Sequence, residues 1–183
     1  HNRYFIIILF LSLSISYAKR AITFKDILKF EDMKSEFITD NGKWITYRLD
    51  KQRGNNNFVI QSTENNKKYI IENGNNAQYS EDTKWFAIKK DIDVIKQLNP
   101  NKYKNEKPDL ELINTSNDNR ETINEVSGYS LAKNGKWLIY TKIYDKKDKQ
   151  KGKKLILRHL ASETEIPIEN VIDFVLDSLG NNI

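Results

Sequence analysis

The sequence predicts an all-β fold: a partial β-propeller of about three four-stranded blades and the start of a fourth, preceded by a signal peptide and a short α-helix. The first observation behind this prediction is a recurring motif in which a polar turn is followed by Lys-Trp and an alternating apolar strand. The second is its spacing, since Trp44, Trp85 and Trp137 lie 41 and 52 residues apart, and Asn182 takes the equivalent place 45 residues further on. Periods of about 40–50 residues with four strands each are typical of propeller blades.

The composition is that of one globular domain or of part of a larger one. Of the 183 residues, 38% are hydrophobic, 30% are charged and 11% are aromatic. The lack of cysteine excludes a disulfide scaffold, thiolate zinc sites, iron–sulfur clusters, a cysteine nucleophile and a lipid-anchored cysteine. Only two histidines are present, and one is the first residue, which argues against a multi-histidine metal site. We therefore predict neither a metal nor a cofactor.

The net charge of +5 allows attraction to acidic surfaces. Most of this charge comes from lysines that are scattered among Asn and Asp, and no basic helix or stacking motif accompanies them. We therefore expect no nucleic-acid partner.

Residues 1–18 have the pattern of a secretory signal peptide. Arg3 supplies a positive n-region, residues 5–15 form an apolar h-region, and Ser16 and Ala18 stand at the −3 and −1 positions of a small-x-small cleavage site. The apolar run is shorter than the roughly 20 residues that span a bilayer, which favours cleavage over an uncleaved membrane anchor. Export without cysteine fits a bacterial periplasmic or secreted protein that has no membrane segment after cleavage.

An N-terminal segment over residues 19–36 follows the signal. Residues 23–26 read TFKD, which is the spacing of a capping box with Asp in place of the usual Glu. We predict one amphipathic helix over residues 24–33 that packs against the domain that follows. The apolar residues that share its face are Ile27, Leu28 and Met33.

Residues 37–183 are predicted to form the propeller. Four similar stretches begin its blades: FITDNGKWITYRL, QYSEDTKWFAIKK, YSLAKNGKWLIYTK and FVLDSLGNNI. The predicted blades span residues 37–73, 77–124 and 128–168, with an incomplete blade from residue 173. Third strands are expected at 58–62, 110–114 and 155–159, and fourth strands at 68–71, 121–123 and 164–168.

The chemistry of the turn explains the motif. The Asn-Gly pairs at 41–42 and 134–135 can adopt the positive φ that a tight hairpin between twisted strands requires. Thr83 lacks that freedom, so we expect a different turn in the second repeat. In the strand after the first turn, Trp44 and Ile45 point to opposite faces, and both faces carry large side chains, as in a sheet packed between two others.

Two Lys-rich segments interrupt the period, at residues 95–108 and 145–154, each between the second and third strands of its blade. We interpret them as solvated hairpin loops rather than as loops that guide a substrate. The alternative fold is a β-sandwich built from hairpins, but the recurring Lys-Trp motif favours the propeller.

One short motif imitates a catalytic site. Residues 128–132 read GYSLA, which resembles the Gly-x-Ser-x-Gly turn of a serine hydrolase with Ala in the last place. That turn needs a preceding strand and a following helix, whereas Ser130 is aligned with Ser80 in the repeat, and a turn and a strand follow. His159 lies on a predicted strand only 29 residues further on. The spacing of the acidic residues does not indicate a catalytic pair of carboxylates; these residues include Glu31, Asp32, Asp91 and Asp93. We therefore predict no catalytic, cofactor-binding or metal-ligating residue.

The order of these features resembles a known enzyme family. A signal peptide, then ITFKDILKFEDMK, then FITDNGKWITYRL is similar to the N-terminal region of secreted serine peptidases of the prolyl oligopeptidase family. The likeness includes the dipeptidyl-peptidase-like and acylaminoacyl-peptidase-like branches, in particular the large periplasmic forms of Bacteroidetes-type bacteria. It covers residues 21–183 and is strongest over residues 22–47. It implies an N-terminal propeller of seven or eight blades that limits access to peptides, and a C-terminal α/β-hydrolase domain with a Ser-Asp-His triad.

Because the sequence stops inside the motif of a fourth blade, we expect an N-terminal fragment of such a peptidase, truncated before its catalytic domain. By itself the fragment would not hydrolyse peptides. Its partners would be the missing catalytic domain of the same polypeptide and the peptide substrate of the parent enzyme. The alternative is a fragment of a non-enzymatic, TolB-like periplasmic propeller that binds protein or cell-envelope partners. A complete small β-protein is a third possibility, which predicts cooperative unfolding of residues 19–183.

Overall fold

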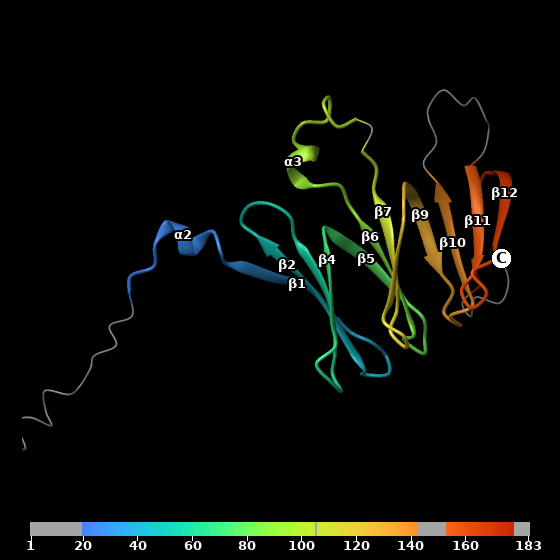
Figure 1. The fold of residues 1–183 in the computed structure, drawn as a ribbon, viewed down its shortest axis with the longest axis horizontal. Helices are drawn as coiled ribbons and strands as arrows, with labels where there is room; N and C mark the ends of the chain where they lie inside the picture. Colours follow the sequence, from blue (N-terminus) through green and yellow to red (C-terminus); the bar gives the residue numbers. More distant parts are fainter. Residues whose placement is uncertain (1–19, 105, 143–152, 178–183) are drawn as a thin grey trace, which may run out of the picture.

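The computed structural model describes residues 20–104, 106–142 and 153–177. Over these residues the chain forms three antiparallel four-stranded sheets, which confirms the all-β class and the partial β-propeller (Figure 1). In each sheet the strands lie side by side in chain order. The first sheet holds β1 (Glu31–Ile38), β2 (Trp44–Lys51), β3 (Asn57–Ser62) and β4 (Lys68–Glu72); the second holds β5 (Gly74–Tyr79), β6 (Trp85–Lys90), β7 (Asp109–Asn114) and β8 (Asn119–Ile123); the third holds β9 (Val126–Leu131), β10 (Trp137–Lys142), β11 (Lys153–His159) and β12 (Glu165–Val171).

Two apolar clusters join the sheets, which stand next to one another like blades (Figure 1). The second sheet is buried on both sides: Phe86 and Ala87 are neighbours in β6, point to opposite clusters and are both 0% exposed. The cluster between the first and second sheets contains Trp44, Phe58, Ile60, Tyr69, Ile71, Phe86, Ile88 and Ile113. The cluster between the second and third sheets contains Ala87, Leu110, Leu112, Ile123, Val126, Leu131, Leu138, Tyr140, Ile156 and Leu160.

The motif tryptophans point toward the following blade. Trp44 packs against the second sheet, with its ring centroid 5.9 Å from that of Phe86. Trp85 packs in the same way against the cluster that the second sheet shares with the third. In β10 it is Leu138 that points back to the second sheet, so Trp137 lies on the opposite face, where its ring meets that of His159 at 4.9 Å. The third sheet therefore presents the same tryptophan face that the first two use for blade packing.

The expectation of a different turn at Thr83 is wrong, because all three turns have one geometry. Thr83 has a φ of +56°, close to the +69° of Gly42 and the +68° of Gly135. Its N–H donates to the Ser80 carbonyl at 2.7 Å, as that of Gly42 does to Thr39 at 2.7 Å. Thr83 is buried, and its Oγ1 accepts a hydrogen bond from the Asn41 side chain of the neighbouring turn at 3.0 Å. Tertiary hydrogen bonds thus offset the backbone cost of a left-handed threonine.

Alanine at Gly135 is expected to destabilise the chain more than alanine at Gly42. Either substitution places a side chain in the left-handed region, which costs about 1–2 kcal/mol. A Cβ at Gly42 meets nothing within 4 Å, whereas a Cβ at Gly135 lies 3.2 Å from the Cβ of Ser80. Urea unfolding should therefore show a loss of about 1 kcal/mol for Gly42→Ala and a clearly larger one for Gly135→Ala. Equal losses would contradict the close approach of the turn to Ser80.

The predicted helix over residues 24–33 is shorter than expected. The helix α2 (Phe24–Ile27) begins with the predicted capping box, in which Asp26 accepts the Thr23 N–H at 2.9 Å. Two hydrogen bonds from Arg20 are the main reason why the pKa of Asp26 falls to about 2. The helix buries none of its residues and lies away from the sheets, so it does not pack on the first blade (Figure 1).

The first strand begins at Glu31, whereas the first blade was predicted to begin at Phe37. The backbone of residues 31–34 pairs with the end of β2, and Lys34 Nζ lies 3.2 Å from the Asp50 carboxylate. The pairing register shifts between Lys34 and Phe37, beside Ser35 with its φ of +54°. Met33, which the helical pattern places on an apolar helix face, is therefore a strand residue opposite Leu49.

The three sheets span residues 31–72, 74–123 and 126–171. The insertion predicted at 95–108 lies between β6 and β7 and contains a short helix, α3 (Val94–Gln97). Residues 172–177 form no strand, although Phe174 and Leu176 line hollows beside β9 where a fourth blade would begin. An isolated strand lacks hydrogen-bonding partners, and the strand predicted to pair with this one falls beyond the described residues.

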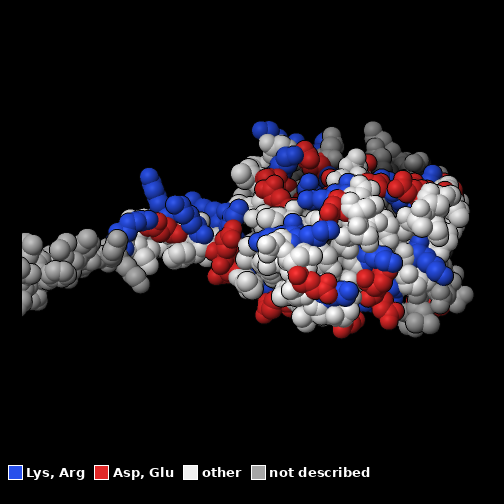
Figure 2. All heavy atoms as spheres, turned by 60° about the horizontal axis from the view of Figure 1, so that its bottom comes forward, with Lys and Arg blue, Asp and Glu red and all other residues white. Residues whose placement is uncertain are grey.

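The predicted signal peptide over residues 1–18 lies outside the described residues, as does most of the segment 145–154. No helix among the described residues has the length and the apolar character of a membrane-spanning segment. On the face of the molecule in Figure 2, Lys and Arg side chains are interspersed with Asp and Glu side chains.

Candidate functional site

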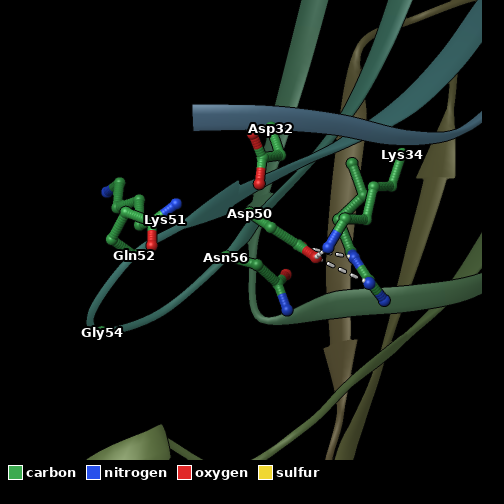
Figure 3. A pocket seen from close by; sticks show the side chains of 8 residues that line it. Asp32, Lys34, Asp50, Lys51, Gln52, Gly54 and Asn56 are labelled. Carbon is green, nitrogen blue, oxygen red and sulfur yellow. Dashed lines mark hydrogen bonds and ion pairs between the residues drawn. The ribbon is translucent and has the colours of Figure 1, made fainter. Parts of the chain in front are cut away.

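A charged hollow of about 340 Å³ lies at the edge of the first sheet, where β1 begins and β2 ends (Figure 3). The antiparallel ladder explains its charges, because it places Asp32 opposite Asp50 and Lys34 opposite Arg48. The hollow is lined by Asp32, Lys34, Arg48, Asp50, Lys51, Gln52, Gly54 and Asn56. None of these lining residues is a histidine, serine, threonine or tyrosine.

Asp50 is the centre of this cluster. Arg48 donates to its two carboxylate oxygens at 2.6 and 2.9 Å, and Lys34 Nζ lies 3.2 Å away. The hydrogen bonds from Arg48 lower the pKa of Asp50, and they outweigh the opposing effect of its partial burial. Asp50 is thus paired with Arg48 within β2 and with Lys34 of β1, and the Lys34–Asp50 contact joins the two strands (Figure 3).

Asp50→Asn is expected to reduce stability at neutral pH and to leave it unchanged in strong acid. A depressed folded-state pKa contributes stability above the unfolded value of about 3.9, and this is lost as the pH falls through the folded value. Because the Asp50 side chain is 21% exposed, we expect a loss of about 1 kcal/mol or less. Urea unfolding of both proteins at pH 7 and at about pH 2 tests this. A difference that persists in acid would mean that the substitution disturbs packing rather than an ion pair.

The inner edges of the second and third sheets are bridged by a side chain. β5 and β9 are each the terminal strand of their sheet, so alternate backbone groups point away from the ladder. The Gln78 carboxamide accepts the N–H of Leu131 at 2.7 Å and donates to the carbonyl of Tyr129 at 3.4 Å. One primary amide thereby satisfies two backbone groups of the β9 edge.

Among the residues that the structure describes, no side chain makes such a bridge between the inner edges of the first and second sheets. Phe37 and Gln78 each stand seven residues before the tryptophan of their blade. Each also pairs with the residue two places after that tryptophan, which is Thr46 for Phe37 and Ala87 for Gln78. Phe37 therefore occupies the position of Gln78, and its ring lies 5.7 Å from that of Tyr79. A pocket of about 270 Å³ opens here, lined by Ser35, Phe37, Thr46, Phe58, Asn76, Ala77 and Tyr79.

The residues that imitate catalytic groups do not come together. Ser130 pairs with Ile139 in the ladder, which is the position of Gln78 and Phe37, so its alignment with Ser80 was wrong by two residues. Strand β10 separates Ser130 from His159, whose Nδ1 instead lies 2.9 Å from Ser162 Oγ. Asp93 caps α3 by accepting the Ile95 N–H at 2.7 Å. Among the described residues, no three His, Asp or Glu side chains converge on a metal position.

The sequence comparisons find no family model that matches the chain and no similar curated protein. Solved structures do match. The β-propeller domain of the trilobed protease from Pyrococcus furiosus, described as an open Velcro topology, has a TM-score of 0.50 and 17% identity over 76% of this chain and 43% of that one. A structure from a study of two prolyl endopeptidases has a TM-score of 0.50 and 11% identity over 78% of this chain and 22% of that one.

TolB from Acinetobacter baumannii also matches, with a TM-score of 0.47 and 14% identity over 82% of this chain and 36% of that one. The chain thus spans less than half the length of each of these three structures. At such identities the likeness concerns the fold alone. The chain therefore has the fold of part of a β-propeller, shared with the propeller domain of the trilobed protease.

Proposed function

We propose that the chain is the N-terminal propeller part of a secreted serine peptidase of the prolyl oligopeptidase family. In this proposal the propeller limits access to peptides, and an α/β-hydrolase domain of the same polypeptide supplies the serine, which is acylated with histidine as the base. The propeller itself contributes no triad residue. The enzyme works in the bacterial periplasm or outside the cell, after cleavage behind Ala18.

The observation that carries this proposal is the tandem array of Lys-Trp blades that follows a short helical segment. The array has the fold of a protease propeller domain at a TM-score of 0.50. The helical segment adds support, because its apolar side chains have no partner on the described blades. Ile22 and Phe24 are each 68% exposed, and Phe30 is 51% exposed. In this proposal a further domain of the same polypeptide buries these side chains.

The test is the coding sequence beyond residue 183. The proposal expects four or five more blades and then a Gly-x-Ser-x-Gly turn on a strand–helix junction, followed by Asp and His. Blades that continue to the stop codon would instead establish a binding module of the TolB-like kind. Mass spectrometry of the exported protein should find Lys19 as the first residue, and a retained signal would contradict the proposed localisation.

A further inference from the structure

The space between β1 and β5 corresponds to the space between β5 and β9, but it lacks the glutamine bridge, because Phe37 stands where β5 has Gln78. Between β5 and β9 the Gln78 amide bonds the N–H of Leu131 and the carbonyl of Tyr129. Leu131 and Tyr129 stand six and eight residues before the tryptophan of their blade. Tyr79 and Ala77 have the same spacing in the second blade, so the equivalent groups between β1 and β5 are the N–H of Tyr79 and the carbonyl of Ala77. Both residues line the 270 Å³ pocket.

Phe37 cannot replace the bridge. Its phenyl ring has no donor or acceptor for these two backbone groups, and it lies against the Tyr79 ring instead. Two edge groups are therefore left for a ligand to bond, beside two aromatic rings. Phe37 is 47% exposed, so its ring is accessible to a ligand.

We infer that this pocket binds one residue of an extended, uncharged peptide. In a parallel strand pair, one residue of the first strand makes two hydrogen bonds to the second strand. Its N–H donates to the C=O of the residue before the one it faces, and its C=O accepts the N–H of the residue after it. The Gln78 amide makes this same pair of bonds from within the chain. A peptide added beside β5 would make them by strand addition, a recognised mode of peptide binding.

The surroundings define the class of peptide. None of the seven residues that line the pocket is charged, and three of them are the apolar side chains of Phe37, Phe58 and Ala77. Two charged residues lie near Tyr79 without lining the pocket: Lys133 Nζ is 4.5 Å from the centre of the Tyr79 ring, and Asp40 interacts with the Tyr79 hydroxyl. Inside the pocket, a charged ligand residue would lose hydration and find no opposite charge among the lining residues. An apolar residue would instead pack on the Phe37 and Tyr79 rings. The inference goes beyond the proposed peptidase function, since it concerns this chain whether or not a hydrolase domain follows.

The test is a titration of the 183-residue chain with the blocked tripeptide N-acetyl-Ala-Val-Ala-amide, followed through backbone amide resonances. The Tyr79 N–H should move downfield and saturate, because it gains a hydrogen bond. The Leu131 N–H should stay in place, because Gln78 already bonds it. Propionamide at the same concentration should have a smaller effect, since it offers the amide without the side chain. An equal response to propionamide would overturn the assignment to a peptide residue.

Two substitutions at one position sharpen the test. Phe37→Gln installs the bridge found between β5 and β9, and it should weaken peptide binding at least about tenfold, because the two backbone groups then have an internal partner. Phe37→Leu keeps the groups free, so the Tyr79 shift should persist with weaker affinity. Gln78→Leu frees the β9 edge, and the Leu131 N–H should then respond as well. A silent Tyr79 N–H in the folded wild-type chain, or unchanged binding by Phe37→Gln, would overturn the inference.

Discussion

Phe86→Ala is expected to cost about 3–5 kcal/mol of unfolding free energy, because a buried aromatic ring is removed and a cavity remains. Phe86 is 0% exposed and lies between the first and second sheets. Its ring centroid is 5.9 Å from that of Trp44 and 5.8 Å from that of Tyr79, so the substitution removes contacts to both blades at once. Typical domains are stable by about 5–15 kcal/mol, so this loss would be a large fraction of the free energy of unfolding.

Urea unfolding followed by tryptophan fluorescence measures this effect, since Trp44 reports on the disturbed interface. Phe30→Ala is the matched control: it removes the same side chain from a site that is 51% exposed, and it should change stability by no more than about 0.5 kcal/mol. A loss below about 1 kcal/mol for Phe86→Ala would mean that the two sheets do not pack as described.

Arg158→Ala is expected to cost about 2–3 kcal/mol, below the roughly 3–5 kcal/mol that breaking a fully buried ion pair costs. Arg158 lies on β11 in the third sheet with its side chain 8% exposed, and it donates twice to Glu121 of β8 at 2.6 Å. Glu121 is 39% exposed and can regain water, which limits the loss. Glu165, which accepts the Tyr140 hydroxyl at 2.7 Å, lies 3.6 Å from the guanidinium.

The control for this prediction is Arg158→Met, which removes the charge but keeps most of the packed volume. It should cost less than Arg158→Ala, because well-packed apolar replacements of buried ions are often tolerated. Denaturant unfolding in low and in high salt gives the comparison, and the loss for Arg158→Ala should change little with salt, since buried pairs are weakly screened. An alanine variant as stable as the wild type would show that the pair does not hold the second and third blades together.

The repeat made the sheets predictable because its turn is local. A turn with positive φ followed by Trp and an alternating strand defines the hairpin between the first two strands, and the blade period then places the other two. Thr83 shows the limit of this reasoning. Threonine is unfavourable at positive φ in isolation, but the bond from Asn41, 42 residues away, holds it there.

The N-terminal boundary could not be predicted for a related reason. The capping pattern at Thr23 gives the start of a helix correctly, but the end of that helix depends on a partner strand. Residues from Glu31 onward pair with the end of β2, and the Lys34–Asp50 ion pair supports that pairing. The local spacing of apolar residues does not predict this pairing between residues 31–34 and the end of β2.

The peptide pocket could not be predicted from the sequence, because recognising it requires knowing which residues occupy equivalent positions in different blades. The alignment of Ser130 with Ser80 followed residue type rather than distance from the motif tryptophan. Counted from the tryptophan, Phe37, Gln78 and Ser130 share one position, and this count would have marked Gln78 as the polar member. The bonds from Gln78 to the next blade still require the structure.

The central claim, that this propeller serves a serine peptidase, is tested most directly by labelling the full-length protein with a fluorophosphonate probe. Peptide mapping then locates the modified residue. The account predicts one labelled serine, in a Gly-x-Ser-x-Gly turn beyond residue 183, together with hydrolysis of short peptides that the probe abolishes. Ser130 should stay unlabelled, because β10 separates it from His159. A folded full-length protein in which no serine reacts, or in which Ser130 does, would contradict the account.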